Sequence, residues 1–175
     1  FQYGTFCPIF RAHGRRHPFD TTGPNEIWSY GPQVQKILEK YIRLRYSLMP
    51  YIYTVADKVS ADSYTPMRLL AFDFPADTAV YDIKDQFMFG PAFLVCPVTE
   101  AGATTRKVYL PAGSQWIDYH TGKRHAGGQT ITLDAPLERM PLLVRAGSII
   151  PMEGDSISVY PGADAEFYIY EDDGT

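Results

Sequence analysis

The chain has 175 residues with 45% hydrophobic and 21% charged side chains, which is the composition of a globular protein with enough apolar surface for a core. Its two cysteines, Cys7 and Cys96, exclude a disulfide framework, and no apolar run approaches the roughly 20 residues that span a bilayer. The net charge of −4 combines +4 over residues 1–60 with −8 over residues 61–175, and neither half is a nucleic-acid-binding surface. We therefore expect no nucleic-acid partner and no membrane span.

The first part of the chain predicts a strand–helix–strand unit. Residues 3–11 form a short apolar run typical of a buried strand, and a polar loop follows it. A helix begins at the Gly-Pro pair 31–32, because a proline at the first helical position needs no N–H, and it continues to about residue 60. Residues 65–74 predict a second buried strand. Two strands joined by a crossover of this length pair in parallel, so the predicted unit is βαβ.

The predicted helix has one apolar face. Its apolar side chains recur at three-, four- or seven-residue steps and are Val34, Leu38, Tyr41, Leu48, Ile52, Val55 and Val59. Arg45 falls on this face, where a cation pairs with a carboxylate, reaches out to solvent or binds a ligand. Pro50 lies inside the helix and removes the N–H that would bond the Tyr46 carbonyl, so we expect a kink or a split there.

From residue 85 onwards the pattern is that of an antiparallel β-sandwich. Short strand-like runs alternate with turn residues such as the Gly-Gly pair at 127–128. The runs are 93–98, 107–110, 115–119, 129–133, 142–145, 157–160 and 166–170. The pattern changes near residues 75–85, so the predicted fold class is α/β followed by all-β.

Groups able to do chemistry are few. No isolated pair of carboxylates stands at strand ends, the four histidines lack the spacing of a metal site, and there is no Gly-rich phosphate loop, so we expect no metal and no cofactor. His13 is the exception, because it follows the first predicted strand at the place where α/β sheets and barrels hold their ligands. Its imidazole can donate to a ligand hydroxyl or bond to nearby backbone, and chemistry alone leaves both interpretations open.

Five blocks of sequence stand in a characteristic order. They are residues 6–14 (FCPIFRAHG), 44–53 (LRYSLMPYIY), 66–68 with 72–75 (PMR and FDFP), 85–92 (DQFMFGPA) and 141–151 (PLLVRAGSIIP). Together they cover nearly the whole chain and resemble glycoside hydrolase family 31. Five ordered blocks are far more specific than any single motif.

The resemblance implies a division of the chain. Residues 1–78 would be the C-terminal end of a (β/α)8 catalytic barrel, with the last βαβ part of that barrel. Residues 79–152 would be a proximal C-terminal β-sandwich, and residues 153–175 the start of a distal one. An incomplete barrel would expose the flanks of its βαβ unit, which favours association into a homo-oligomer.

The resemblance also implies a function. The family hydrolyses α-linked glucosides or xylosides with retention, using two aspartates and no metal. Both aspartates are expected upstream of this chain, which begins at Phe1 and ends in a turn signal as a segment of a longer protein would. The chain would thus be the inactive part of a retaining α-glycosidase that removes terminal xylose or glucose from an oligosaccharide substrate. The motif version favours an α-xylosidase over an α-glucosidase.

Individual residues take roles from the same resemblance. His13 matches the histidine that hydrogen-bonds the sugar, and Arg11 matches a nearby arginine that orients it or supports the structure. These two are the predicted substrate-binding residues, and no catalytic residue is predicted within the chain. Arg45 and Arg68 match arginines of structural type.

A non-catalytic carbohydrate-binding module is the alternative from another class of protein. The aromatic content of 14% suits sugar stacking, although it equally suits a β-rich core. In such a module the sugar would lie on exposed aromatic side chains of the sandwich, with Trp116 and Tyr119 as candidates. A buried Trp116 would remove the best candidate.

Overall fold

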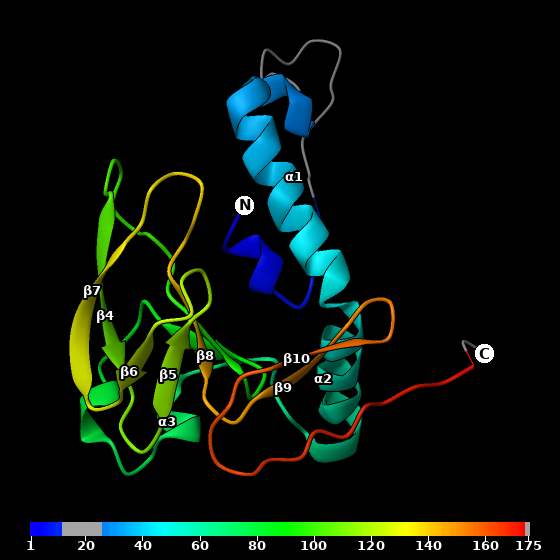
Figure 1. The fold of residues 1–175 in the computed structure, drawn as a ribbon, viewed down its shortest axis with the longest axis vertical. Coiled ribbons are helices and arrows are strands. Elements are labelled where there is room, and N and C mark those ends of the chain that lie inside the picture. Colours follow the sequence, from blue (N-terminus) through cyan, green and yellow to red (C-terminus); the bar gives the residue numbers. More distant parts are fainter. Residues whose placement is uncertain (12–25, 174–175) are drawn as a thin grey trace.

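The computed structural model describes residues 1–11 and 26–173 (Figure 1). Two consecutive helices, α1 (Pro32–Ser47) and α2 (Met49–Asp62), lie beside a β-rich part. Two short 3-10 turns precede them, η1 (Gly4–Phe6) and η2 (Ile27–Tyr30). None of the helices in these residues is long and apolar enough to cross a membrane.

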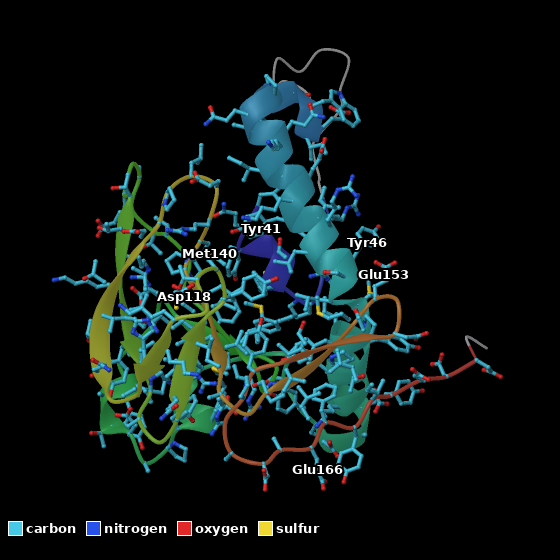
Figure 2. All side chains as sticks on the ribbon, viewed as in Figure 1. Tyr41, Tyr46, Asp118, Met140, Glu153 and Glu166 are labelled. Atoms are coloured by element: carbon cyan, nitrogen blue, oxygen red, sulfur yellow. The ribbon has the colours of Figure 1, made fainter. Side chains whose placement is uncertain are left out.

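The split predicted at Pro50 is confirmed. Leu48 separates the two helices, and Pro50 lies in the first turn of α2, where its missing N–H leaves no internal hydrogen bond unmade. The end of α1 also binds the turn that follows residue 152, because the Glu153 N–H donates to the Ser47 carbonyl at 2.8 Å. Tyr46 and Glu153 accordingly lie close together at the end of α1 (Figure 2).

The strands of the described residues form three antiparallel sheets. The largest has the order β1-β2-β3-β8-β5-β6, made of β1 (Met67–Arg68), β2 (Phe87–Phe89), β3 (Phe93–Val95), β8 (Leu142–Arg145), β5 (Gln115–Asp118) and β6 (Arg124–Ala126). The two pairs are β4 (Thr105–Leu110) with β7 (Gln129–Asp134), and β9 (Ile149–Met152) with β10 (Ser156–Val159). The short helix α3 (Leu70–Asp73) and the turn η3 (Thr78–Val80) connect β1 to β2.

The central strands β3 and β8 of the six-stranded sheet are buried on both faces. In β3, Phe93 and Val95 belong to the core cluster that includes side chains of α1 and α2, whereas Leu94 belongs to the cluster around Trp116. Residues of β8 alternate in the same way, with Leu143 in the second cluster. Successive side chains of a strand point to opposite faces, so a sheet covered twice has continuous apolar strands. The helices and the β4–β7 pair therefore pack on opposite sides of one shared layer.

Two of the predicted strands are wrong, and a third is much shorter than predicted. Residues 3–11 contain η1 instead of a strand, residues 65–74 hold only the two-residue β1 followed by α3, and residues 166–170 hold no strand. The only partner of β1 is β2, which runs antiparallel to it, so no parallel βαβ pair occurs within residues 1–11 and 26–173. Near the N-terminus the backbone N–H groups bond within the segment rather than to a ladder: Thr5 to Phe1, Phe6 to Tyr3 and Cys7 to Gly4. The other six predicted runs each overlap a strand.

Candidate functional site

The two predicted substrate-binding residues lie near the N-terminus. Arg11 is exposed and ends the first described segment, residues 1–11, which we call the N-terminal segment. His13 lies outside the described residues. The geometry of the site is therefore the geometry of the segment that leads to Arg11.

Arg45 of α1 holds the N-terminal segment through three backbone carbonyls. Its Nη1 donates to the Thr5 oxygen at 2.8 Å and to the Cys7 oxygen at 2.7 Å, and its Nη2 donates to the Pro8 oxygen at 3.0 Å. Partial burial lowers the pKa of the Arg45 guanidinium, but a guanidinium stays protonated at any ordinary pH. Arg45 therefore binds backbone carbonyls of the chain itself, where a carboxylate partner, solvent or a ligand was considered.

Phe10, in the N-terminal segment, packs against Arg45 of α1 and against Phe1. Its ring lies 5.8 Å from the guanidinium carbon of Arg45 and packs edge-on against Phe1, with ring centroids 4.8 Å apart. A Cβ at Gly4 would come within 2.6 Å of the Phe10 ring, so the glycine is what allows this approach. Thr5, the next residue, is fully buried. The backbone that enters Arg11 is thus fixed by packing as well as by hydrogen bonds.

Arg68 also has a structural role. Its Nε donates to both carboxylate oxygens of Asp73, at 2.9 and 3.1 Å, and its guanidinium carbon lies 4.5 Å from the centroid of the Tyr64 ring. This pair bridges β1 and α3, which accounts for the turn formed where a strand was predicted. Among the residues with described placement no group of three or more His, Cys, Asp or Glu side chains could hold a metal ion.

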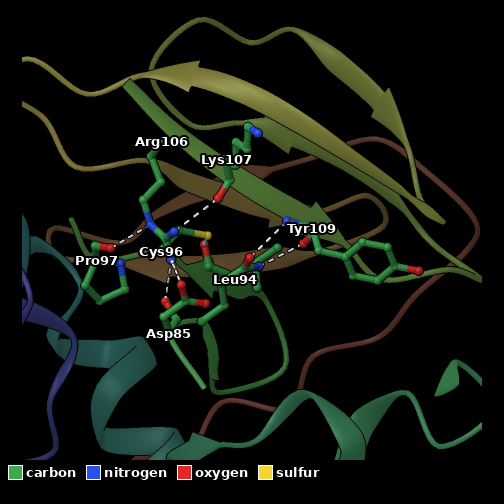
Figure 3. Close-up of polar contacts among 8 residues, drawn as sticks. Asp85, Leu94, Cys96, Pro97, Arg106, Lys107 and Tyr109 are labelled. Atoms are coloured by element: carbon green, nitrogen blue, oxygen red, sulfur yellow. Dashed lines mark hydrogen bonds and ion pairs between the residues drawn. The ribbon is translucent and has the colours of Figure 1, made fainter. Parts of the chain in front are cut away.

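A second arginine network lies in the sandwich (Figure 3). Arg106 donates to the backbone oxygens of Pro97 at 2.7 Å, Lys107 at 3.1 Å and Asp85 at 2.8 Å, and its Nη2 lies 2.9 Å from the Asp85 carboxylate. The nearby Cys96 is fully buried, and burial raises the pKa of its thiol. This network ties β4 to the segments on either side of β2 and β3. Sequence reasoning did not single out Arg106, because its partners are mainly backbone oxygens.

Trp116 does not form a sugar-binding platform. It is fully buried, its indole N–H donates to the Pro111 oxygen at 3.0 Å, and its ring lies 5.7 Å from that of Phe74. Tyr119 is partly buried and packs against Phe93, with centroids 6.3 Å apart. The carbohydrate-binding module therefore loses both of its candidate aromatic residues.

Two family models match successive parts of this chain. The model for the glycosyl hydrolases family 31 TIM-barrel domain matches residues 1–55, and the model for the glycosyl hydrolase family 31 C-terminal domain matches residues 63–150. The chain belongs to glycoside hydrolase family 31. This confirms the predicted fold class of a barrel end followed by a β-rich domain, although the parallel strand pair is not formed.

Relatives in this family resemble the chain over almost all its length. The crystal structure of a GH31 α-xylosidase from Xanthomonas citri is 49% identical with a TM-score of 0.89 and covers 99% of this chain and 20% of its own. An α-xylosidase of Saccharolobus solfataricus is 40% identical over 99% of this chain, and an α-glucosidase 2 of Bacillus thermoamyloliquefaciens is 34% identical over 99%. The chain spans 25% and 23% of the length of these last two relatives.

Proposed function

We propose that this chain is the part of a retaining α-glycosidase that follows its catalytic carboxylates, and that the longer protein removes terminal α-linked xylose from oligosaccharides. The observation that carries the proposal is the similarity to α-xylosidases across 99% of the chain, at 49% and 40% identity. The match of residues 1–55 to the TIM-barrel model supports a place beside the catalytic centre.

The proposed mechanism uses groups from both parts of the longer protein. One aspartate attacks the anomeric carbon, a second protonates the leaving oxygen, and water then hydrolyses the glycosyl-enzyme with the second acting as base. Both aspartates belong to the preceding barrel segments. From this chain, His13 would hydrogen-bond the bound sugar and Arg11 would orient it. No metal takes part in the proposed mechanism.

The proposed division of the chain follows the same family. Residues 1–78 would complete the barrel, residues 79–152 would form the proximal sandwich, and residues 153–175 would begin the distal one. The antiparallel sheets between β2 and β10 support a sandwich in the middle of the chain. Association into a homo-oligomer stays a prediction, to be checked by light scattering.

An assay on aryl α-glycosides tests the location of catalysis. The 175-residue chain and the longer protein are each incubated with aryl α-xyloside and aryl α-glucoside at equal concentration. We expect hydrolysis by the longer protein alone, because the chain carries no catalytic carboxylate pair. Turnover by the short chain would refute the assignment of both aspartates to residues outside it.

The same substrates decide between xylose and glucose. A pocket fitted to xylose has no room for the hydroxymethyl group at C6 of glucose, so steric exclusion should favour the xyloside. We expect a higher kcat/KM on the xyloside. A higher kcat/KM on the glucoside would identify the protein as an α-glucosidase, the alternative that the similarity to α-glucosidase 2 keeps open.

A further inference from the structure

We propose that Arg45 is a positioning residue for glycoside hydrolysis, because its guanidinium sets the path of the N-terminal segment that delivers Arg11 to the sugar. The inference rests on the proposed function above and assigns a role to a residue that does not itself touch substrate. It starts from the three carbonyl contacts of Arg45.

The geometry of Arg45 is specific to a guanidinium. Three carbonyls from Thr5, Cys7 and Pro8 converge on two of its nitrogens within 3.0 Å, at the bend between η1 and Arg11. A planar guanidinium presents its N–H groups as a rigid fork from separate nitrogens, whereas the three N–H groups of a lysine ammonium radiate from one nitrogen and do not reproduce that fork. The contact therefore fixes the shape of the backbone as well as its distance from α1.

The held segment has no regular ladder of its own. It has one 3-10 turn, and the buried Phe6 ring anchors that turn in the core against Phe89 and Phe93. Beyond Phe6, the contacts that hold the segment are those of Arg45 and of the Phe10 ring against Phe1 and Gly4. Arg11 follows Phe10 directly. A change at Arg45 therefore moves the backbone that carries Arg11, although the Arg45 guanidinium contacts only the segment before it.

A merely structural arginine would behave differently. If Arg45 only stabilised the fold, its replacement would lower the free energy of unfolding and leave the activity of each folded molecule unchanged. If it positions Arg11, kcat falls in molecules that are still folded, because a displacement of about 1 Å in a sugar-contacting group costs up to about 100-fold in rate.

Three variants test the inference. Arg45→Met removes the guanidinium but keeps much of the side-chain length, and Arg45→Lys keeps the charge without the fork. Arg43→Met is the matched control, because Arg43 is an exposed arginine on the same helix. Where Arg45→Met fails to fold, Arg45→Lys carries the test.

The first measurement is amide hydrogen exchange on the 175-residue chain. The amides of Thr5, Phe6 and Cys7, which bond within the N-terminal segment, should exchange about tenfold faster in Arg45→Met. Exchange in Arg43→Met should match the unsubstituted chain. Unchanged exchange in Arg45→Met would overturn the inference whatever the activity of the longer protein.

The second measurement is steady-state kinetics of the longer protein on an aryl α-xyloside and an aryl α-glucoside, at a temperature where circular dichroism shows every variant folded. We expect a kcat/KM lower by about 10- to 100-fold in Arg45→Met, carried mainly by kcat, with a smaller loss in Arg45→Lys and none in Arg43→Met. Values within twofold of the unsubstituted protein would overturn the inference and leave the proposed function intact. An unsubstituted protein that hydrolyses no α-glycoside would overturn the proposed function and the inference together.

Discussion

Tyr51 joins α2 to the sandwich through a buried hydroxyl, and its removal gives the sharpest stability prediction. The side chain is fully buried, its hydroxyl donates to the Phe89 carbonyl at 2.8 Å, and the Ala92 N–H donates to it at 3.2 Å. Burial raises the pKa of this phenol well above its ordinary value, so it remains a donor at any working pH. Tyr51→Phe removes the hydroxyl without opening a large cavity.

The cost follows from the two groups left behind. Losing the donated bond costs about 1 kcal/mol, and a buried N–H at Ala92 without an acceptor costs about 1–3 kcal/mol more. The sum of about 2–4 kcal/mol lowers Tm by roughly 5–12 °C for a chain of this length. The expected loss is large compared with the about 0.5 kcal/mol typical of a surface substitution.

Urea unfolding at neutral pH measures this loss, with the fluorescence of the buried Trp116 as the signal. Tyr46→Phe is the matched control, because Tyr46 lies at the end of the neighbouring helix with its side chain 61% exposed (Figure 2). We expect the control to keep its free energy of unfolding within about 0.5 kcal/mol. Equal stability of Tyr51→Phe and Tyr46→Phe would refute the argument that the buried hydroxyl is required.

Further predictions concern pH, thiols and the sandwich network. Burial raises the pKa of Tyr64 and Tyr160 to about 12 from 10.0, so the unfolded chain loses these phenol protons at a lower pH than the folded chain does. The free energy of unfolding should therefore fall as the pH rises from 10 to 12, and a flat profile in urea titrations over this range would contradict this. Under native conditions a thiol reagent should modify the part-exposed Cys7 and spare the buried Cys96 until urea is added, and rapid modification of two thiols per chain would be the contrary result. Arg106→Lys should lower the free energy of unfolding in urea by about 1–3 kcal/mol, because a lysine cannot bond three carbonyls and a carboxylate together. An unchanged urea midpoint would show that the network is dispensable.

Local rules predicted the helical part of the fold well. The apolar periodicity placed the long helical stretch, and the lack of an N–H on Pro50 was enough to predict its split. These are short-range effects that depend on neighbours within one or two turns. The strand-like runs between residues 93 and 160 were also found, because turn residues separate them.

The missed elements depend on contacts that amino-acid composition does not reveal. Residues 3–11 have the composition of a strand, but a strand also needs a ladder partner, and here the backbone bonds locally and to Arg45. Likewise, the ion pair of Arg68 with Asp73 closes a turn within residues 65–74. Composition alone does not distinguish these outcomes.

The candidate site was only partly predictable for the same reason. The motif predicts His13 and Arg11 as substrate-binding residues, and this stays a prediction. Backbone carbonyls are present at every residue, so no pattern marks the three that Arg45 binds. The burial of Trp116 could not be read from its spacing, because both faces of its sheet are covered.

The doubly covered sheet limits how this protein can be recombined. A chimaera that grafts the sandwich onto a foreign barrel would strip the helices from one side of the layer and expose apolar side chains such as Phe93 and Val144 to water. A chimaera should therefore keep α1 and α2 in the same fragment as the strands that they cover.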